Sequence, residues 1–143
     1  MSEKFELKEP NITYSSFENK DAYSMIEAIK KGIEYTFFAQ LSSISPFTIS
    51  DWSRFLHLSE RSMQRYKKER GRFGAVSSEK IIEITMLYKF GIEVFGDKEK
   101  FNKWLSIENI VLGGKKPKEL LDSSFGITII KDELSSIEQG ILA

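Results

Sequence analysis

The sequence has no cysteine and one histidine among its 143 residues. Without cysteine the chain has no disulfide, thiolate metal site or cysteine nucleophile, and its composition fits a reducing compartment. A single histidine cannot build a zinc site with several histidine ligands. The sequence also offers no recognisable pair of nucleophile and base. We therefore expect no cofactor, no metal and no enzymatic activity.

Long apolar runs are absent as well, since no stretch approaches the roughly 18 consecutive apolar residues of a membrane span. Residues 1–4 lack the basic and then apolar layout of a signal peptide. We therefore expect a cytoplasmic protein that does not associate with a membrane. A hydrophobic content of 41% is enough for one compact domain, or for two small helical units that share a core.

The charges balance overall but are distributed unevenly. The chain has 21 basic and 21 acidic residues, which argues against a protein that coats nucleic acid without specificity. Between Arg54 and Arg72, however, seven basic residues face two acidic ones, a net charge of +5. The last 25 residues contain five acidic residues and only Lys131 as a base. One region is therefore suited to an anionic partner and the other is not.

Apolar residues recur at helical spacing along most of the chain, which predicts an all-α fold. Residues 1–20 are polar, contain Pro10 and have no sustained periodicity, so we expect a loose or strapped-down arm. Only Ile127 to Ile130 would suit a strand, and no alternating segment offers it a partner. The expected helices begin, in chain order, at or just after Asp21, Gly32, Thr48, Ser59, Ser77 or Ser78, Asp97, Pro117 and Ser124, and the last one ends at Gly140.

Residues 48–70 have the pattern of a helix-turn-helix. Such a unit needs a small residue in its first helix, a tight turn, and apolar residues on the second helix that face back. Thr48 and Asp51 are spaced as a capping box for the first helix. The remaining parts are Ser53 at the small position, Leu56 and Leu58 around the turn, Ser59 as the second cap, and Met63 and Tyr66 facing the core.

The other side of the second helix carries Arg61, Arg65 and Lys68 at spacings of four and then three residues, which makes one cationic stripe. Arginine and glutamine side chains match base edges in the major groove, and lysine neutralises phosphates. The alternative interpretation is an ordinary solvated helix surface. Because the turn pattern and the basic run coincide, we predict DNA binding through Ser59, Arg61, Ser62, Gln64, Arg65, Lys67 and Lys68.

His57 stands at the turn position where glycine is usual. It must adopt a left-handed conformation, which histidine tolerates better than most residues, or the turn must differ. We expect a structural role for it. Further on, Gly113-Gly114-Lys115 lacks the other residues of a phosphate-binding loop and predicts a tight turn. The apolar end, Ile141 to Ala143, is equally compatible with packing on the chain's own core and with contact to a partner.

The C-terminal third resembles the toxin-binding domain shared by Xre, MbcA and ParS antitoxins. The residues that carry this resemblance are Trp104, Leu105, Asn109, Leu112, Gly113, Gly114, Pro117, Leu120, Leu121, Gly126, Leu134, Ile137 and Gly140. Leu58 to Tyr66 is similar to the Xre type of helix-turn-helix, so the resemblance spans roughly residues 20–143. Two residues depart from the pattern, His57 at the turn and Ser123 where the family often has threonine.

The resemblance implies an antitoxin of a type II toxin-antitoxin pair, which dimerises, represses its own operon and blocks a RES-domain toxin that degrades NAD. It divides the chain into an arm (1–20), a DNA-binding unit (21–76) and a helical toxin-binding domain (77–143). The alternative is a stand-alone transcriptional regulator whose C-terminal helices mediate dimerisation. The toxin-facing residues that the resemblance implies are Leu112, Gly113, Gly114, Pro117, Leu120, Leu121, Leu134, Ile137, Ile141, Leu142 and Ala143.

Overall fold

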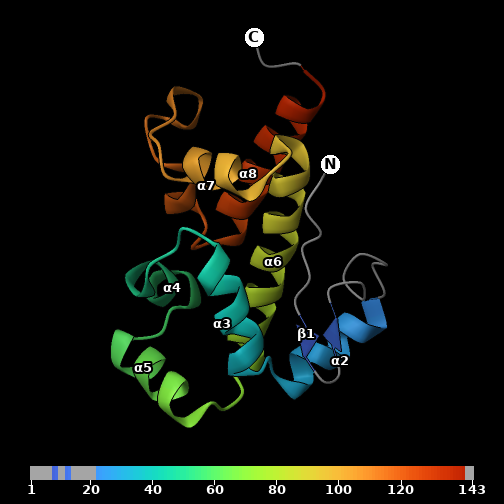
Figure 1. Cartoon of the computed structure of the whole chain (residues 1–143), viewed down its shortest axis with the longest axis vertical. Coiled ribbons are helices and arrows are strands. Elements are labelled where there is room, and N and C mark those ends of the chain that lie inside the picture. Colours follow the sequence, from blue (N-terminus) through green and yellow to red (C-terminus); the bar gives the residue numbers. More distant parts are fainter. Residues whose placement is uncertain (1–7, 10–11, 14–21, 141–143) are drawn as a thin grey trace.

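The computed structural model of the chain describes residues 8–9, 12–13 and 22–140. Apart from one pair of two-residue strands, the fold of this part of the chain is all-α, as predicted, and the long helix α6 (Ala75–Phe95) runs through its middle (Figure 1). Among the described residues, no helix is long and apolar enough to cross a membrane, and no three His, Asp or Glu side chains are grouped to hold a metal ion.

The arm forms one short piece of regular structure that the sequence did not predict. Strand β1 (Lys8–Glu9) pairs with β2 (Ile12–Thr13) in antiparallel register. The four residues are too few to show alternation, so a periodicity argument could not detect them. Strand β1 also contacts α3, which is consistent with an arm held by contacts elsewhere. The predicted cap Asp21 lies outside the described residues.

The first two helices are α2 (Ala22–Lys31) and α3 (Tyr35–Ile44). Gly32 separates them with φ 91°, a conformation that favours glycine, and a Cβ there would collide with the main-chain oxygen of Phe73. Helix α3 ends two residues before Pro46, because a proline disfavours helical geometry in the residue before it. Its inward face supplies Phe37, Phe38 and Leu41 to the core.

The longest helix, α6 (Ala75–Phe95), begins earlier than predicted. Gly74 is its N-cap, whereas the sequence suggested a start at Ser77 or Ser78. Both serines are instead buried within the first turns. The Ser78 hydroxyl accepts a hydrogen bond from the Ile33 amide at 2.8 Å and donates one to the Phe73 carbonyl at 3.3 Å. A serine can therefore tie the helix to a neighbouring segment as well as cap it.

The remaining helices lie at two levels along α6 (Figure 1). They are α4 (Ile49–Leu56), α5 (Glu60–Glu69), α7 (Lys98–Leu105), the short 3-10 turns η1 (Ile110–Leu112) and η2 (Pro117–Leu120), and α8 (Ser124–Glu138). Of these, α4 and α5 lie lower, whereas α7 and α8 lie near the upper end of α6 (Figure 1). Helix α5 and the end of α8 are thus at opposite ends of the molecule.

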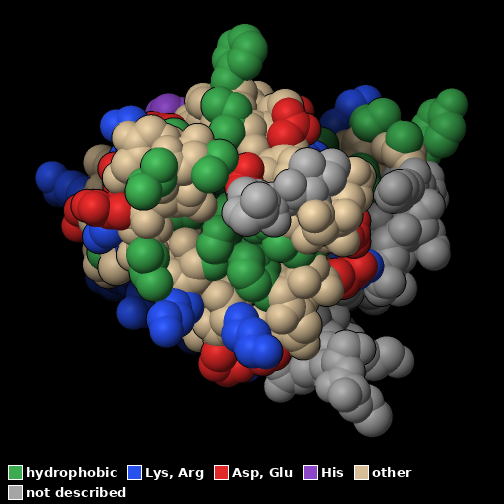
Figure 2. Space-filling model, turned by 90° about the horizontal axis from the view of Figure 1, so that it is seen from above, with side chains coloured by type: hydrophobic (Ala, Val, Ile, Leu, Met, Phe, Trp, Pro, Cys, Tyr) green, Lys and Arg blue, Asp and Glu red, His purple; other side chains and the backbone are tan. Residues whose placement is uncertain are grey.

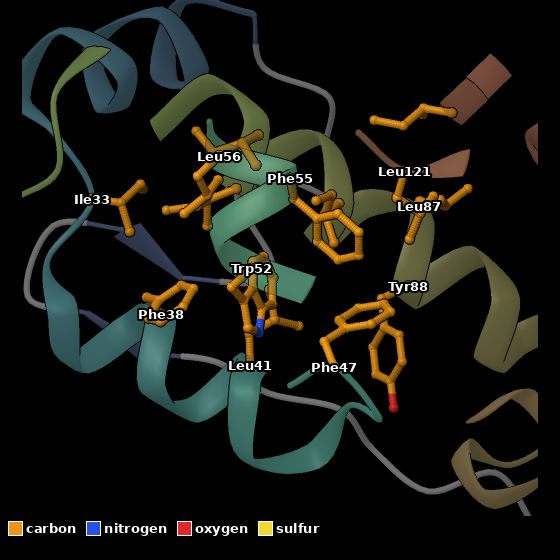
Figure 3. Close-up of a cluster of buried hydrophobic side chains, with 14 of the residues drawn as sticks. Ile33, Phe38, Leu41, Phe47, Trp52, Phe55, Leu56, Leu87, Tyr88 and Leu121 are labelled. Atoms are coloured by element: carbon orange, nitrogen blue, oxygen red, sulfur yellow. The ribbon is translucent and has the colours of Figure 1, made fainter. Parts of the chain in front are cut away.

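One continuous core joins these helices. Trp52 is fully buried at its centre, and its ring meets the ring of Phe38 edge-on with the centroids 4.7 Å apart (Figure 3). Leu87 and Tyr88 from α6 and Leu121 from the segment before α8 belong to the same cluster. Because α6 is shared, the two halves support each other. The predicted division of the chain at residue 77 stays a prediction.

Candidate DNA and partner interfaces

The first helix of the helix-turn-helix, α4, begins at the predicted capping box. Thr48 Oγ1 accepts a hydrogen bond from the Asp51 amide at 3.0 Å, and the Asp51 carboxylate accepts one from the Thr48 amide at 2.9 Å. These bonds satisfy amides that the start of a helix leaves free. The inner face of α4 consists of Trp52, Phe55 and Leu56, which are all buried.

The turn after α4 keeps its geometry with histidine in the usual place of glycine. His57 has φ 54° and ψ 40°, the left-handed conformation that the sequence required. The Ser53 hydroxyl donates to the Leu58 carbonyl, and the Leu58 amide donates to the Ser53 carbonyl at 3.1 Å. A small side chain at Ser53 therefore closes the turn, and the doubt that His57 raised about the turn is resolved.

Helix α5 is fixed at its start and along its inner face. The Ser59 hydroxyl caps it by accepting a hydrogen bond from the Ser62 amide at 3.0 Å. Met63 is fully buried, and the ring of Tyr66 stacks on Phe73 with the centroids 4.5 Å apart. The inner face thus matches the prediction, which leaves the opposite face of α5 in solvent.

That outer face carries the predicted cations. Within the part of the chain that the structure describes, none of them forms an ion pair, although the Arg65 guanidinium lies over the Tyr66 ring at 5.7 Å. Ser62 is half-buried, and its hydroxyl accepts from the Ser59 hydroxyl at 3.1 Å. The exposed members of the predicted DNA-binding set are Ser59, Arg61, Gln64, Arg65, Lys67 and Lys68.

Two members of the basic run serve the fold instead. The Arg72 guanidinium donates to the Glu34 carboxylate at 2.8 Å and to the Gly32 carbonyl at 2.7 Å, and Arg54 faces the C-terminal half of the chain. A charge count along the sequence cannot distinguish basic residues that are paired within the fold from basic residues that face solvent. Arg70, which the predicted set left out, ends α5 with φ 51° and is exposed, so it extends the cationic surface.

An ion pair joins the helix-turn-helix to the C-terminal half. Lys118 Nζ lies 3.0 Å from Asp51 Oδ2, and both side chains are mostly shielded from water. Burial raises the pKa of the Asp51 carboxyl, but the Thr48 amide and the Lys118 ammonium outweigh this effect. The pKa of Asp51 is therefore lower than its usual value.

Further contacts join α4 and the turn to residues 118–122, which we call the docking segment. Arg54 donates to the Glu119 carbonyl at 3.1 Å, and its guanidinium lies 3.8 Å from the Asp122 carboxylate. His57 Nε2 lies 3.1 Å from the Asp122 carbonyl oxygen. The sequence predicted a structural role for His57, but it gave no sign of these partners, which are about 65 residues away.

The predicted turn at Gly113 and Gly114 is present, with φ 75° and 81°. It closes a small loop in which the Asn109 amide donates to the Lys115 carbonyl at 3.0 Å, and the Gly114 amide donates to the Asn109 carbonyl at 2.9 Å. Both glycines are exposed, whereas Leu112 is half-buried. The loop therefore presents backbone and apolar side chains to solvent at one side of the C-terminal half.

Several predicted partner-binding side chains point into the chain's own core. Pro117, Leu121 and Leu134 are buried, and Leu120 and Ile137 are partly buried. Leu121 and Leu134 belong to the common hydrophobic core. A role of the three buried residues in partner binding stays a prediction. They support the exposed residues around them. Ile141, Leu142 and Ala143 lie outside the described residues.

The C-terminal half also exposes apolar side chains that the prediction missed. Ile110 is 93% exposed and Phe125 is 86% exposed. Figure 2, which views the end near α7 and α8, shows separate groups of hydrophobic side chains among charged ones. A signal was present, since Phe125 and Ile129 are four residues apart and lie off the buried stripe of α8. Among the described residues of the C-terminal half, the exposed large apolar side chains are Ile107, Ile110, Val111, Phe125 and Ile129.

Two family models match the chain, one on each half. The antitoxin Xre-like helix-turn-helix domain matches residues 24–85. The C-terminal toxin-binding domain of the Xre/MbcA/ParS antitoxins matches residues 91–140. The chain belongs to the Xre/MbcA/ParS antitoxin family. The first match ends and the second begins within α6, the helix that both halves of the antitoxin share.

Known proteins agree with this assignment. The antitoxin is 24% identical over 120 residues to antitoxin Xre of Yersinia enterocolitica, which covers 83% of this chain and 81% of that protein. Its fold is similar to a chain in the crystal structure of the M. tuberculosis MbcT–MbcA toxin–antitoxin complex, with a TM-score of 0.52 at 15% identity. That match covers 68% of this chain and 86% of the other.

Proposed function

We propose that this antitoxin represses its own operon through α5 and neutralises a RES-type toxin that degrades NAD through its C-terminal half. The observation that carries the DNA part is the outer face of α5. Arg61, Arg65 and Lys68 are exposed on a helix that is capped and packed in a helix-turn-helix, and they have no acidic partner among the described residues. Unpaired cations placed in this way neutralise phosphates and reach base edges in the major groove.

The toxin part is supported by the exposed apolar side chains within the region that matches the toxin-binding domain. Large apolar side chains that lie almost entirely in solvent mark interaction surfaces. Ile110 and Val111 at the loop, and Phe125 and Ile129 on α8, supply such a surface. Gly113 and Gly114 permit close approach of a partner to the loop backbone. We expect this surface and α5 to bind different partners, so that a homodimer of the antitoxin holds toxin and operator together.

The test is co-expression with the neighbouring open reading frame. We expect that frame alone to stop growth and to lower cellular NAD, and co-expression of this chain to restore both. Ile110→Asp combined with Phe125→Asp is expected to abolish the rescue, because burying a carboxylate in an apolar contact is costly. The matched control is Val76→Asp, a substitution at a residue that is 83% exposed on the first turn of α6 and therefore outside the proposed surface.

A harmless neighbour that never co-purifies with this chain would contradict the antitoxin proposal and favour a stand-alone regulator. A toxic neighbour that leaves NAD unchanged would keep the antitoxin but remove the RES assignment. Rescue that survives the Ile110 and Phe125 substitutions would place the toxin contact elsewhere. Size measurement of the purified protein tests the homodimer separately.

A further inference from the structure

The contacts between α4 and the docking segment have a specific arrangement. Asp51 lies at the start of α4, Arg54 in its middle and His57 just after its end, so the docking segment is held along the whole length of the helix. On the other side, the segment passes directly into Ser123, whose hydroxyl caps α8 by accepting from the Gly126 amide at 3.0 Å. The contacts along α4 therefore hold the start of α8 against the helix-turn-helix.

Asp51 also caps α4 within the helix-turn-helix, whereas Arg54 and His57 are not part of that cap. Glycine would serve the left-handed turn better than His57, because it adopts positive φ without steric cost. Within α4, the Arg54 guanidinium lies 3.5 Å from the Asp51 carboxylate and 5.0 Å from the centroid of the Phe55 ring. Arg54 and His57 both reach Asp122 in the other half of the chain. Both side chains therefore connect the two halves.

The docking segment is also packed into the core, and α4 is joined to α5 by a short turn. Leu121, in the middle of the docking segment, is buried in the common core next to residues of α6. The turn at His57 leads within two residues to the cap of α5. A continuous series of contacts therefore leads from α5 through α4 to the docking segment and to the first turn of α8, where Phe125 is exposed.

We propose that Arg54 and His57 are positioning residues that couple DNA binding at α5 to partner binding at the start of α8. This inference rests on the proposed function. Ordering of α5 on DNA lowers the conformational freedom of residues 117–127, so a partner that docks there pays a smaller entropic cost. Because such coupling is reciprocal, a partner bound at α8 strengthens DNA binding by the same factor.

The experiment is amide hydrogen exchange of the full chain, with and without a duplex spanning the DNA upstream of its reading frame. We expect protection at α5 and, in addition, exchange at residues 117–127 slowed by about five-fold or more, the lower end of typical allosteric coupling. In the variant Arg54→Met with His57→Asn, protection at α5 persists and the effect at 117–127 is lost. Asparagine is chosen because it tolerates the left-handed turn.

The control is Lys115→Met, which removes an exposed cation on the adjacent loop and should leave the response unchanged. If the double variant fails to fold, Asp122→Asn removes the ion pair with Arg54 alone and is expected to reduce the response in part. Absence of protection at α5 would overturn the proposed DNA binding together with the coupling. Protection at α5 with no response at 117–127, or a response that both variants retain, would overturn the coupling alone.

Discussion

The imidazole Nε2 of His57 lies 3.1 Å from the main-chain oxygen of Asp122, while the backbone of His57 is left-handed with φ 54°. One residue therefore shapes the turn of the helix-turn-helix and touches the segment that leads into α8. Left-handed geometry costs most L-residues about 1–2 kcal/mol, and the hydrogen bond offsets part of that cost.

We expect His57→Gly to change the free energy of unfolding by less than about 1 kcal/mol, because relief of strain opposes loss of the hydrogen bond. His57→Val is expected to destabilise the protein by about 2 kcal/mol, since a β-branched residue rarely adopts positive φ. Urea denaturation monitored by circular dichroism measures both. Equal stability of the two variants would show that the left-handed turn does not constrain this position.

Acid should weaken the start of α4. The pKa of Asp51 is lower in the folded chain than its ordinary value of 3.8, so its contribution is complete above that value and is lost as pH falls through the lower folded pKa. Asp51→Asn is expected to lower stability at neutral pH by about 1 kcal/mol, as for other N-terminal helix contacts, and to flatten the stability curve in acid. Denaturation midpoints across the acid range test this, with Asp132→Asn on the exposed side of α8 as the control.

Gly126 is a test of packing within the C-terminal half. A Cβ at this position would collide with the Leu120 carbonyl oxygen, so Gly126→Ala is expected to destabilise by about 2 kcal/mol although alanine is the better helix former. Gly71→Ala, where a Cβ meets nothing within 4 Å, should be close to neutral. Thermal unfolding of the two variants gives the comparison. A stabilised Gly126→Ala would contradict the close approach of η2 to α8.

Local patterns in the sequence predicted most of the fold. The capping box at Thr48, the turn at Gly113 and Gly114, and the inward side of α5 all occur as expected, because each is determined by residues a few positions apart. The start of α6 was wrong, since Ser78 hydrogen-bonds to Ile33 and Phe73. A contact across 45 residues cannot be read from local propensity.

Of the two candidate surfaces, the sequence predicted the one on α5 better than the one on the C-terminal half. Exposure on α5 follows from helical periodicity, so Arg61 and Arg65 were placed correctly on its outer face. In the C-terminal half, an apolar residue that packs on α6 and one that faces solvent look alike in sequence. Leu134 is buried and Ile110 is exposed, and only the packed structure distinguishes them.

The salt dependence of DNA binding tests the role of the α5 cations. Each phosphate neutralised lowers log K by about 0.9 per log unit of salt. Replacing Arg61 and Arg65 with alanine should reduce the slope by about 2 and weaken binding by about 1–3 kcal/mol for each arginine that contacts a base. Fluorescence anisotropy at several salt concentrations measures both quantities. Lys103→Ala, an exposed cation on α7, is the control and should leave the slope unchanged.

The central claim is that α5 and the exposed apolar surface of the C-terminal half serve different partners. The most direct test measures operator binding and rescue from the neighbouring toxin in parallel for two variants, Arg61→Ala with Arg65→Ala, and Ile110→Asp with Phe125→Asp. The account predicts that the first variant loses DNA binding and still rescues, whereas the second binds DNA and fails to rescue. Loss of both functions in either variant, with the fold intact by circular dichroism, would contradict it.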